Sequence, residues 1–118
     1  MTGLFEGGDE QAGPADSLRV VTLLARGVRE AGALASEPAV QAELFHTLGG
    51  IYQQLGDFER ADSLMTAALA RWHALPRPDS AEVARGLTGL GLLRADQSRL
   101  EEADSLARLG LAITRRLV

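Results

Sequence analysis

The feature that most constrains the fold of this chain is an internal repeat with an offset of 42 residues. Residues 59–64, ERADSL, return as EEADSL at residues 101–106, and the pair LG at 48–49 returns at 90–91. A third copy of Ala-Asp-Ser-Leu stands at residues 15–18. Repeats of about 20 to 50 residues are typical of solenoids, in which each unit buries its apolar face against its neighbours. The 118 residues therefore hold two and a half copies of one stacking unit.

Each unit has the apolar spacing of two α-helices, because apolar and small residues recur at intervals of three and four. Ala and Leu, both strong helix formers, supply 19 and 20 residues, whereas Val and Ile together supply eight. Gly56 suits the end of one helix and Asp57 the N-cap of the next. Asp79 and Glu82 have the spacing of a capping box. We therefore predict an all-α fold with helices over residues 15–35, 38–55, 58–74, 80–96 and 99–117.

The first full unit carries aromatic and small residues in the pattern Phe45-x-x-Leu48-Gly49-x-x-Tyr52-x-x-x-Gly56-x-Phe58-x-x-Ala61-x-x-x-Met65-x-x-Ala68-Leu69. This pattern resembles the tetratricopeptide repeat, a helix-turn-helix unit of about 34 residues. The resemblance implies a right-handed superhelical solenoid of about five antiparallel helices, namely two full helix pairs and a preceding helix. Small side chains at Gly49, Ala61 and Ala68 would let paired helices approach closely. In the second copy Arg94 replaces the aromatic residue and Ser98 the turn glycine, which predicts a weaker unit.

The tetratricopeptide resemblance also implies a binding surface. Arrays of this family bind a peptide or protein on the concave surface formed by the first helix of each pair. The positions that correspond to this surface are Glu43, His46, Gly50, Gln53 and Gln54 in the first full unit and Arg85, Thr88, Leu92 and Asp96 in the second. The set is mixed in charge, and of these residues only Arg85 could hold a carboxylate through two parallel hydrogen bonds. A solvated helix face that binds nothing remains the alternative.

A narrower pattern covers almost the whole chain and consists of four runs in order: GLFE at 3–6, LLARGVR at 23–29, EPAVQAEL at 37–44 and LGGIYQQLG at 48–56. Their order is similar to the C-terminal region of bacterial transmembrane serine/threonine protein kinases. In those proteins a cytoplasmic kinase domain, one membrane span and a short Leu-Phe segment precede a tetratricopeptide array on the far side of the membrane. The resemblance implies an extracytoplasmic regulatory or sensor region of a membrane-anchored kinase. The chain has no kinase motif itself, so we expect it to be non-catalytic.

Composition argues against several other function classes. With no Lys and a net charge of -4, the chain lacks the basic surface that nucleic-acid binding needs. It has no Cys, and its two histidines, His46 and His73, lack neighbouring ligands at metal-binding spacing. The longest uncharged stretch, residues 44–56, is too short to span a membrane. We therefore expect a protein or peptide ligand, with no nucleic acid, no membrane insertion and no metal or cofactor.

The two ends of the array predict self-association. We place the repeat domain at residues 14–118 and interpret residues 1–13, which hold four glycines, as a linker or a partial first helix. Apolar side chains are left over near both ends, although the sequence does not show which of them face outward: Leu23, Leu24 and Val28, and Leu109, Ile113 and Leu117. Because closed two-fold contacts dominate among homo-oligomers, a homodimer is expected of the isolated chain. Two alternatives to the regulatory region of a kinase stay open: the tetratricopeptide region of a bacterial transcriptional regulator, and a stand-alone oligomerisation or scaffold module.

Overall fold

The computed structural model describes residues 14–76 and 80–117, with side chains from residue 19 onward. Both ranges consist of α-helices joined by short turns, and neither contains a strand. The helices are α2 (Pro14–Gly32), α3 (Pro38–Gln54), α4 (Phe58–His73), α5 (Ala81–Asp96) and α6 (Leu100–Leu117). The predicted all-α fold of five helices is confirmed, and every predicted helix end lies within three residues of the observed one. The expectation for residues 1–13 lies outside the described residues.

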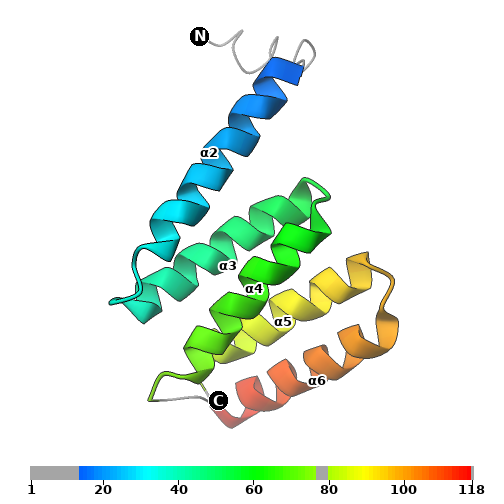
Figure 1. The fold of residues 1–118 in the computed structure, drawn as a ribbon. Coiled ribbons are helices and arrows are strands. Elements are labelled where there is room, and N and C mark those ends of the chain that lie inside the picture. Colours follow the sequence, from blue (N-terminus) through cyan, green and yellow to red (C-terminus); the bar gives the residue numbers. More distant parts are fainter. Residues whose placement is uncertain (1–13, 77–79, 118) are drawn as a thin grey trace, which may run out of the picture.

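The helices pack as two pairs with a preceding helix at one side (Figure 1). Helix α3 packs against α4 and helix α5 against α6, while α4 packs against α5 and so joins the two pairs. Helix α2 lies against α3 near its own C-terminal end, and its N-terminal half extends away from the pairs (Figure 1). This stacking also brings α3 into contact with α5. The first helices of the two full units therefore share one surface.

The turns inside the two helix pairs close in the same way. Gly56 after α3 has φ +82° and Ser98 after α5 has φ +62°, so both residues are left-handed. The amide of Asp57 donates to the carbonyl of Tyr52 at 2.9 Å, and the equivalent bond after Ser98 measures 2.8 Å. These bonds form the Schellman motif that commonly ends a helix with a glycine. Ser98 therefore occupies a conformation that favours glycine.

Side-chain N-caps begin two of the helices. Asp57 accepts a hydrogen bond from the amide of Arg60 at 3.2 Å, and the hydroxyl of Ser80 accepts one from the amide of Val83 at 3.3 Å. The N-cap of α5 is thus Ser80, and Asp79 of the predicted capping box lies outside the described residues. The side chain of Arg60 also donates to Asp57, and both hydrogen bonds keep the pKa of that carboxyl below its ordinary value.

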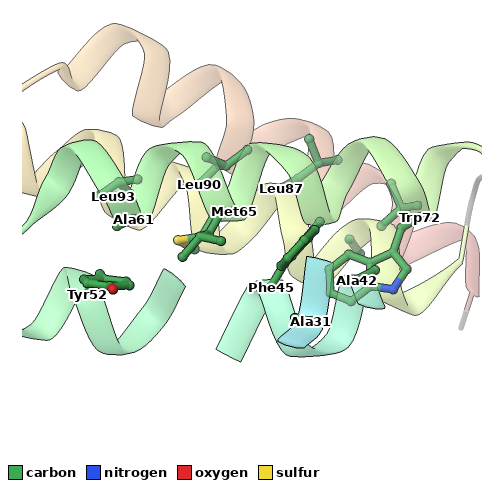
Figure 2. Close-up of a cluster of buried hydrophobic side chains, with 14 of the residues drawn as sticks. Ala31, Ala42, Phe45, Tyr52, Ala61, Met65, Trp72, Leu87, Leu90 and Leu93 are labelled. Carbon is green, nitrogen blue, oxygen red and sulfur yellow. The ribbon is translucent and has the colours of Figure 1, made fainter. Parts of the chain in front are cut away.

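The core follows the interface of α3, α4 and α5 (Figure 2). Ala61 and Ala68 on α4 are completely buried. A Cβ atom added to Gly49 on α3 would lie 2.6 Å from the Cγ atom of Met65, so a larger residue would have to displace Met65. Tyr52 and Met65 fill the space beside these small residues (Figure 2). The predicted close approach of α3 and α4 at small residues is confirmed.

An ion-pair network joins the two units where the second one departs from the repeat pattern. Arg94 takes in α5 the place of Tyr52 in α3, and its side chain is only 14% exposed. It donates to Asp62 of α4 at 2.9 Å and lies 3.4 Å from Glu102 of α6. Burial opposes ionisation of Asp62, but hydrogen bonds from Arg94 and Thr66 outweigh it and hold the pKa of this carboxyl below its ordinary value. Arg94 therefore replaces aromatic packing with contacts to two neighbouring helices, which the prediction of a weaker second unit did not include.

Helix α2 is fastened at its C-terminal end by one buried amide. Gln41 on α3 donates to the carbonyls of Ala31 at 2.9 Å and Gly32 at 3.2 Å, and it accepts a hydrogen bond from Arg71 of α4. Because the hydrogen bonds of this buried amide reach α2 on one side and α4 on the other, Gln41 ties α2 to both members of the first pair. Leu24 adds an apolar contact, since it is buried in the same core cluster.

The structure divides the apolar residues predicted at the two ends into exposed and buried sets. Leu24 and Ile113 are buried because they face the neighbouring helix, and Val28 is partly buried. The residues exposed to solvent are Leu23, Leu109 and Leu117. The two ends thus keep apolar surface, but Ile113 belongs to the core between α5 and α6.

Candidate functional site

The residues predicted for the binding surface meet along the seam between α3 and α5. At one point Arg85 Nη2 donates to Glu43 Oε1 at 2.6 Å, and farther along Gln53 Nε2 donates to Asp96 Oδ2 at 2.7 Å. The side chains of Arg85 and Glu43 are about half exposed. Such exposed pairs add little stability, so their main effect here is to fix the orientation of side chains on the surface.

His46 lies half-buried between these helices. Its ring centroid is 5.3 Å from that of Trp72 on α4, with the two planes tilted by 53°. A Cβ atom added to Gly89 on α5 would come within 2.9 Å of the imidazole, so glycine makes room for the ring. Burial lowers the pKa of His46, the charge of Arg85 lowers it further, and Glu43 acts in the opposite direction. The Nδ1 atom is buried and has no hydrogen-bond partner in the described part of the chain.

Trp72 on α4 packs against both His46 and Arg85. Its own side chain is 1% exposed, and a Cβ atom on Gly86 of α5 would lie 3.2 Å from its ring. The guanidinium carbon of Arg85 stands 5.1 Å from the ring centroid of Trp72, within cation–π distance. This tryptophan thus packs on the next unit. Arg85 is therefore held by a carboxylate on α3 and an aromatic face on α4.

A pocket of about 540 Å³ opens beside this cluster. Its volume lies within the range of small-ligand sites, about 300–1,000 Å³. Helix α5 supplies most of the lining, with one residue from α3 and two from α6. The lining residues are His46, Ala81, Ala84, Arg85, Thr88, Gly89, Leu92, Thr114 and Leu117.

Comparison with known protein families shows to which family this architecture belongs. A family model for the tetratricopeptide repeat matches residues 40–116, which cover α4, α5 and nearly all of α3 and α6. The chain belongs to the tetratricopeptide repeat family. No curated protein and no solved structure matches it. Tetratricopeptide domains are generally non-catalytic and bind proteins or peptides, so this chain is a protein-interaction module.

The structure does not bring every predicted groove position of this tetratricopeptide domain to the pocket. Four of them, His46, Arg85, Thr88 and Leu92, line it. A Cβ atom on Gly50 would meet nothing within 4 Å. The remaining positions, Glu43, Gln53, Gln54 and Asp96, lie on the same two helices but outside the lining.

Sequence reasoning missed the part of the tetratricopeptide pocket that α6 contributes. Thr114 and Leu117 line it, although they belong to a second helix of a pair and the groove positions were transferred only to first helices. The contact between Trp72 and Arg85 was also not predicted. The available indication that α6 contributes to the pocket was Leu117, an exposed apolar residue at the end of the last helix.

The pocket combines a few polar groups with apolar side chains. Its polar groups are one guanidinium, one imidazole and hydroxyl groups, set against an apolar lining. Within the described residues no group of three His, Cys, Asp or Glu side chains could hold a metal ion. In the same ranges no helix combines the length and apolarity needed to cross a membrane.

Proposed function

We propose that the concave surface on α3 and α5 binds a segment of a partner protein, with the pocket at α5 as its main contact. The observation that carries the proposal is that four of the groove positions surround one pocket, with Arg85 held against Glu43 and Trp72 at its rim. A side chain that is already oriented loses less conformational freedom on binding. The surface is thus suited to recognise a ligand without rearrangement.

Selection of binding peptides from a random library tests this proposal. Thr88 is exposed on α5 and lines the pocket, whereas Ser63 is exposed on α4 and does not. We expect selected peptides to lose most of their affinity for Thr88→Arg and to keep it for Ser63→Arg. Circular dichroism should show that both variants are folded. Equal affinity for the two variants would show that the peptides do not bind at this surface.

We further propose that the chain is the regulatory or sensor region of a bacterial membrane-anchored serine/threonine kinase, in an extracytoplasmic position. The support is the order of the runs at residues 3–6, 23–29, 37–44 and 48–56. Reading the coding sequence that precedes the codon of Met1 tests this proposal. A kinase domain followed by an apolar span would support it, and a DNA-binding domain there would favour the transcriptional regulator instead.

A second candidate function, self-association, is favoured by the outer face of α6. Leu111 holds in α6 the repeat position that Leu69 holds in α4. Leu69 packs toward α5, since a Cβ atom on Gly86 would lie 3.0 Å from its Cδ1 atom. Leu111 has no such cover among the described residues and is 49% exposed. We propose that a second copy of the chain covers this face in a homodimer.

Light scattering over a range of protein concentrations tests the dimer. Leu111→Glu should give monomers, because burying an unpaired charge costs several kcal/mol. Ala112→Glu is the matched control, since Ala112 is exposed on the same helix. A monomeric mass at every concentration would rule out the dimer. Ile113 is unsuitable for this test because it is buried between α5 and α6.

A further inference from the structure

The pocket beside α5 has apolar walls and a charged rim, and this difference in polarity indicates the kind of ligand that fits it. Its walls include Ala81, Ala84, Leu92 and Leu117, all apolar. Leu92 is 61% exposed although it lines a hollow surface. The apolar area that these side chains leave open would be covered most favourably by an aliphatic side chain.

The same hollow is not built in the first unit. The repeat position of Leu92 is held there by Gly50, and a Cβ atom at Gly50 would meet nothing within 4 Å. The wall that Leu92 provides is therefore a property of the second unit. A ligand that uses this wall is fixed at one place along the seam and cannot slide to an equivalent place on α3.

Arg85 brings a positive charge to the rim, and Glu43, which bonds it, lies outside the lining. Among the described residues, Arg85 is the charged member of the pocket lining and no acid lines it. Its Nη2 atom bonds Glu43, whereas its Nε and Nη1 atoms have no hydrogen-bond partner among the described residues. A guanidinium bonds carboxylates more strongly than neutral acceptors. The free edge of Arg85 therefore favours an acidic group that approaches from the pocket side.

We propose that this pocket binds an internal peptide segment in which an aliphatic side chain lies next to an acidic one. The aliphatic side chain packs against Leu92, and the acidic side chain bonds the free edge of Arg85. The carboxylate comes from an Asp or Glu side chain, so a free C-terminus is not required. This inference rests on the proposed binding function of the α3–α5 surface and adds the chemistry of its ligand.

Disulfide exchange on the whole chain tests the proposal, because the sequence contains no cysteine. Thr88→Cys places a single thiol at the pocket, and Ser63→Cys places one on α4 as the matched control. The probes are hexapeptides with an N-terminal cysteine and an amidated C-terminus that differ at two central positions: Leu-Glu, Leu-Lys or Gly-Glu. Tethering raises the local peptide concentration, so that a weak preference becomes measurable as an exchange constant against free thiol.

At Thr88→Cys the Leu-Glu peptide should exchange about tenfold more favourably than either other peptide, a difference of about 1.4 kcal/mol. At Ser63→Cys the three peptides should be equivalent. Adding Arg85→Gln should remove the difference between Leu-Glu and Leu-Lys and keep the advantage over Gly-Glu. Circular dichroism should show that each variant is folded.

Equal exchange of the three peptides at Thr88→Cys, or a preference for Leu-Lys, would overturn the proposal. A preference for Leu-Glu over Leu-Lys that persists in Arg85→Gln would also overturn it, because the acidic side chain would then not bind Arg85. In each case the broader binding function would still be supported if library peptides bind the wild type and not Thr88→Arg. If the library yields no such peptides, the binding function itself is contradicted.

Discussion

Ser98→Gly should stabilise the protein, because Ser98 occupies a backbone conformation that favours glycine. Its φ of +62° matches the +82° of Gly56 at the equivalent turn, and both turns close with the same hydrogen bonds. Ser98 is exposed, and its side chain makes no hydrogen bond among the described residues. The substitution therefore removes strain without removing a contact.

The size of the effect follows from two opposing terms. A left-handed conformation costs a residue other than glycine about 1–2 kcal/mol. The greater freedom of glycine in the unfolded chain offsets about 0.5–1 kcal/mol of that gain. The net stabilisation by Ser98→Gly is therefore about 0.5–1 kcal/mol. For a chain of this length that raises the unfolding midpoint by about 2–4 °C.

Thermal unfolding followed by circular dichroism at the helix band measures this shift. The reciprocal variant, Gly56→Ser, is the matched control and should lower the midpoint by a similar amount. The double variant with both changes should lie near wild type, because the two turns belong to different helix pairs and their effects should add. A lower midpoint for Ser98→Gly would refute the reasoning, since it would show that the serine side chain contributes a contact larger than the strain.

Two further predictions concern the core and the seam. Ala61→Leu should destabilise the protein by about 1–3 kcal/mol through overpacking against α3, whereas Ala70→Leu, at an exposed position of the same helix, should have little effect in urea unfolding. Because burial and Arg85 lower the pKa of His46 in the folded state, the unfolded chain binds the proton more readily. Stability should therefore be fully present above about pH 6.5 and decrease as the pH falls toward the lowered pKa, and His46→Gln should flatten this slope. Equal urea midpoints for the two alanine variants, or an unchanged pH slope in His46→Gln, would contradict these expectations.

The helices and turns could be predicted from the sequence because they depend on local rules. Apolar spacing gave the helices, and the comparison of the two repeat copies gave Ser98 as the partner of Gly56. The same comparison makes Glu43 and Arg85 equivalent positions, and the structure shows that a hydrogen bond joins them. These successes share one cause, since a residue's position in a repeat determines the helix face on which it lies.

The features that the sequence left undetermined depend on which helix lies next to which. Ile113 and Leu117 belong to one apolar stripe, yet Ile113 is buried and Leu117 lines the pocket. Arg94 departs from the repeat pattern, and only the position of Asp62 on the neighbouring helix shows that an ion pair takes the place of the aromatic contact. A pattern along one helix does not specify the side chain that faces it from another.

The two repeat copies differ at residues of the pocket, and this difference affects binding more than folding. The core position of Ala61 keeps its character, since the second copy also has alanine there in the sequence EEADSL. At the seam, Gly50 corresponds to Leu92 and His46 to Thr88. Gly50 and Leu92 do not pack into the core, so this position can change with little effect on the packing that joins the pairs, whereas His46 packs against Trp72. A second unit that carried the seam residues of the first would keep its helix pair and lose the wall at Leu92, so the specificity of this surface resides in the side chains that the two copies do not share.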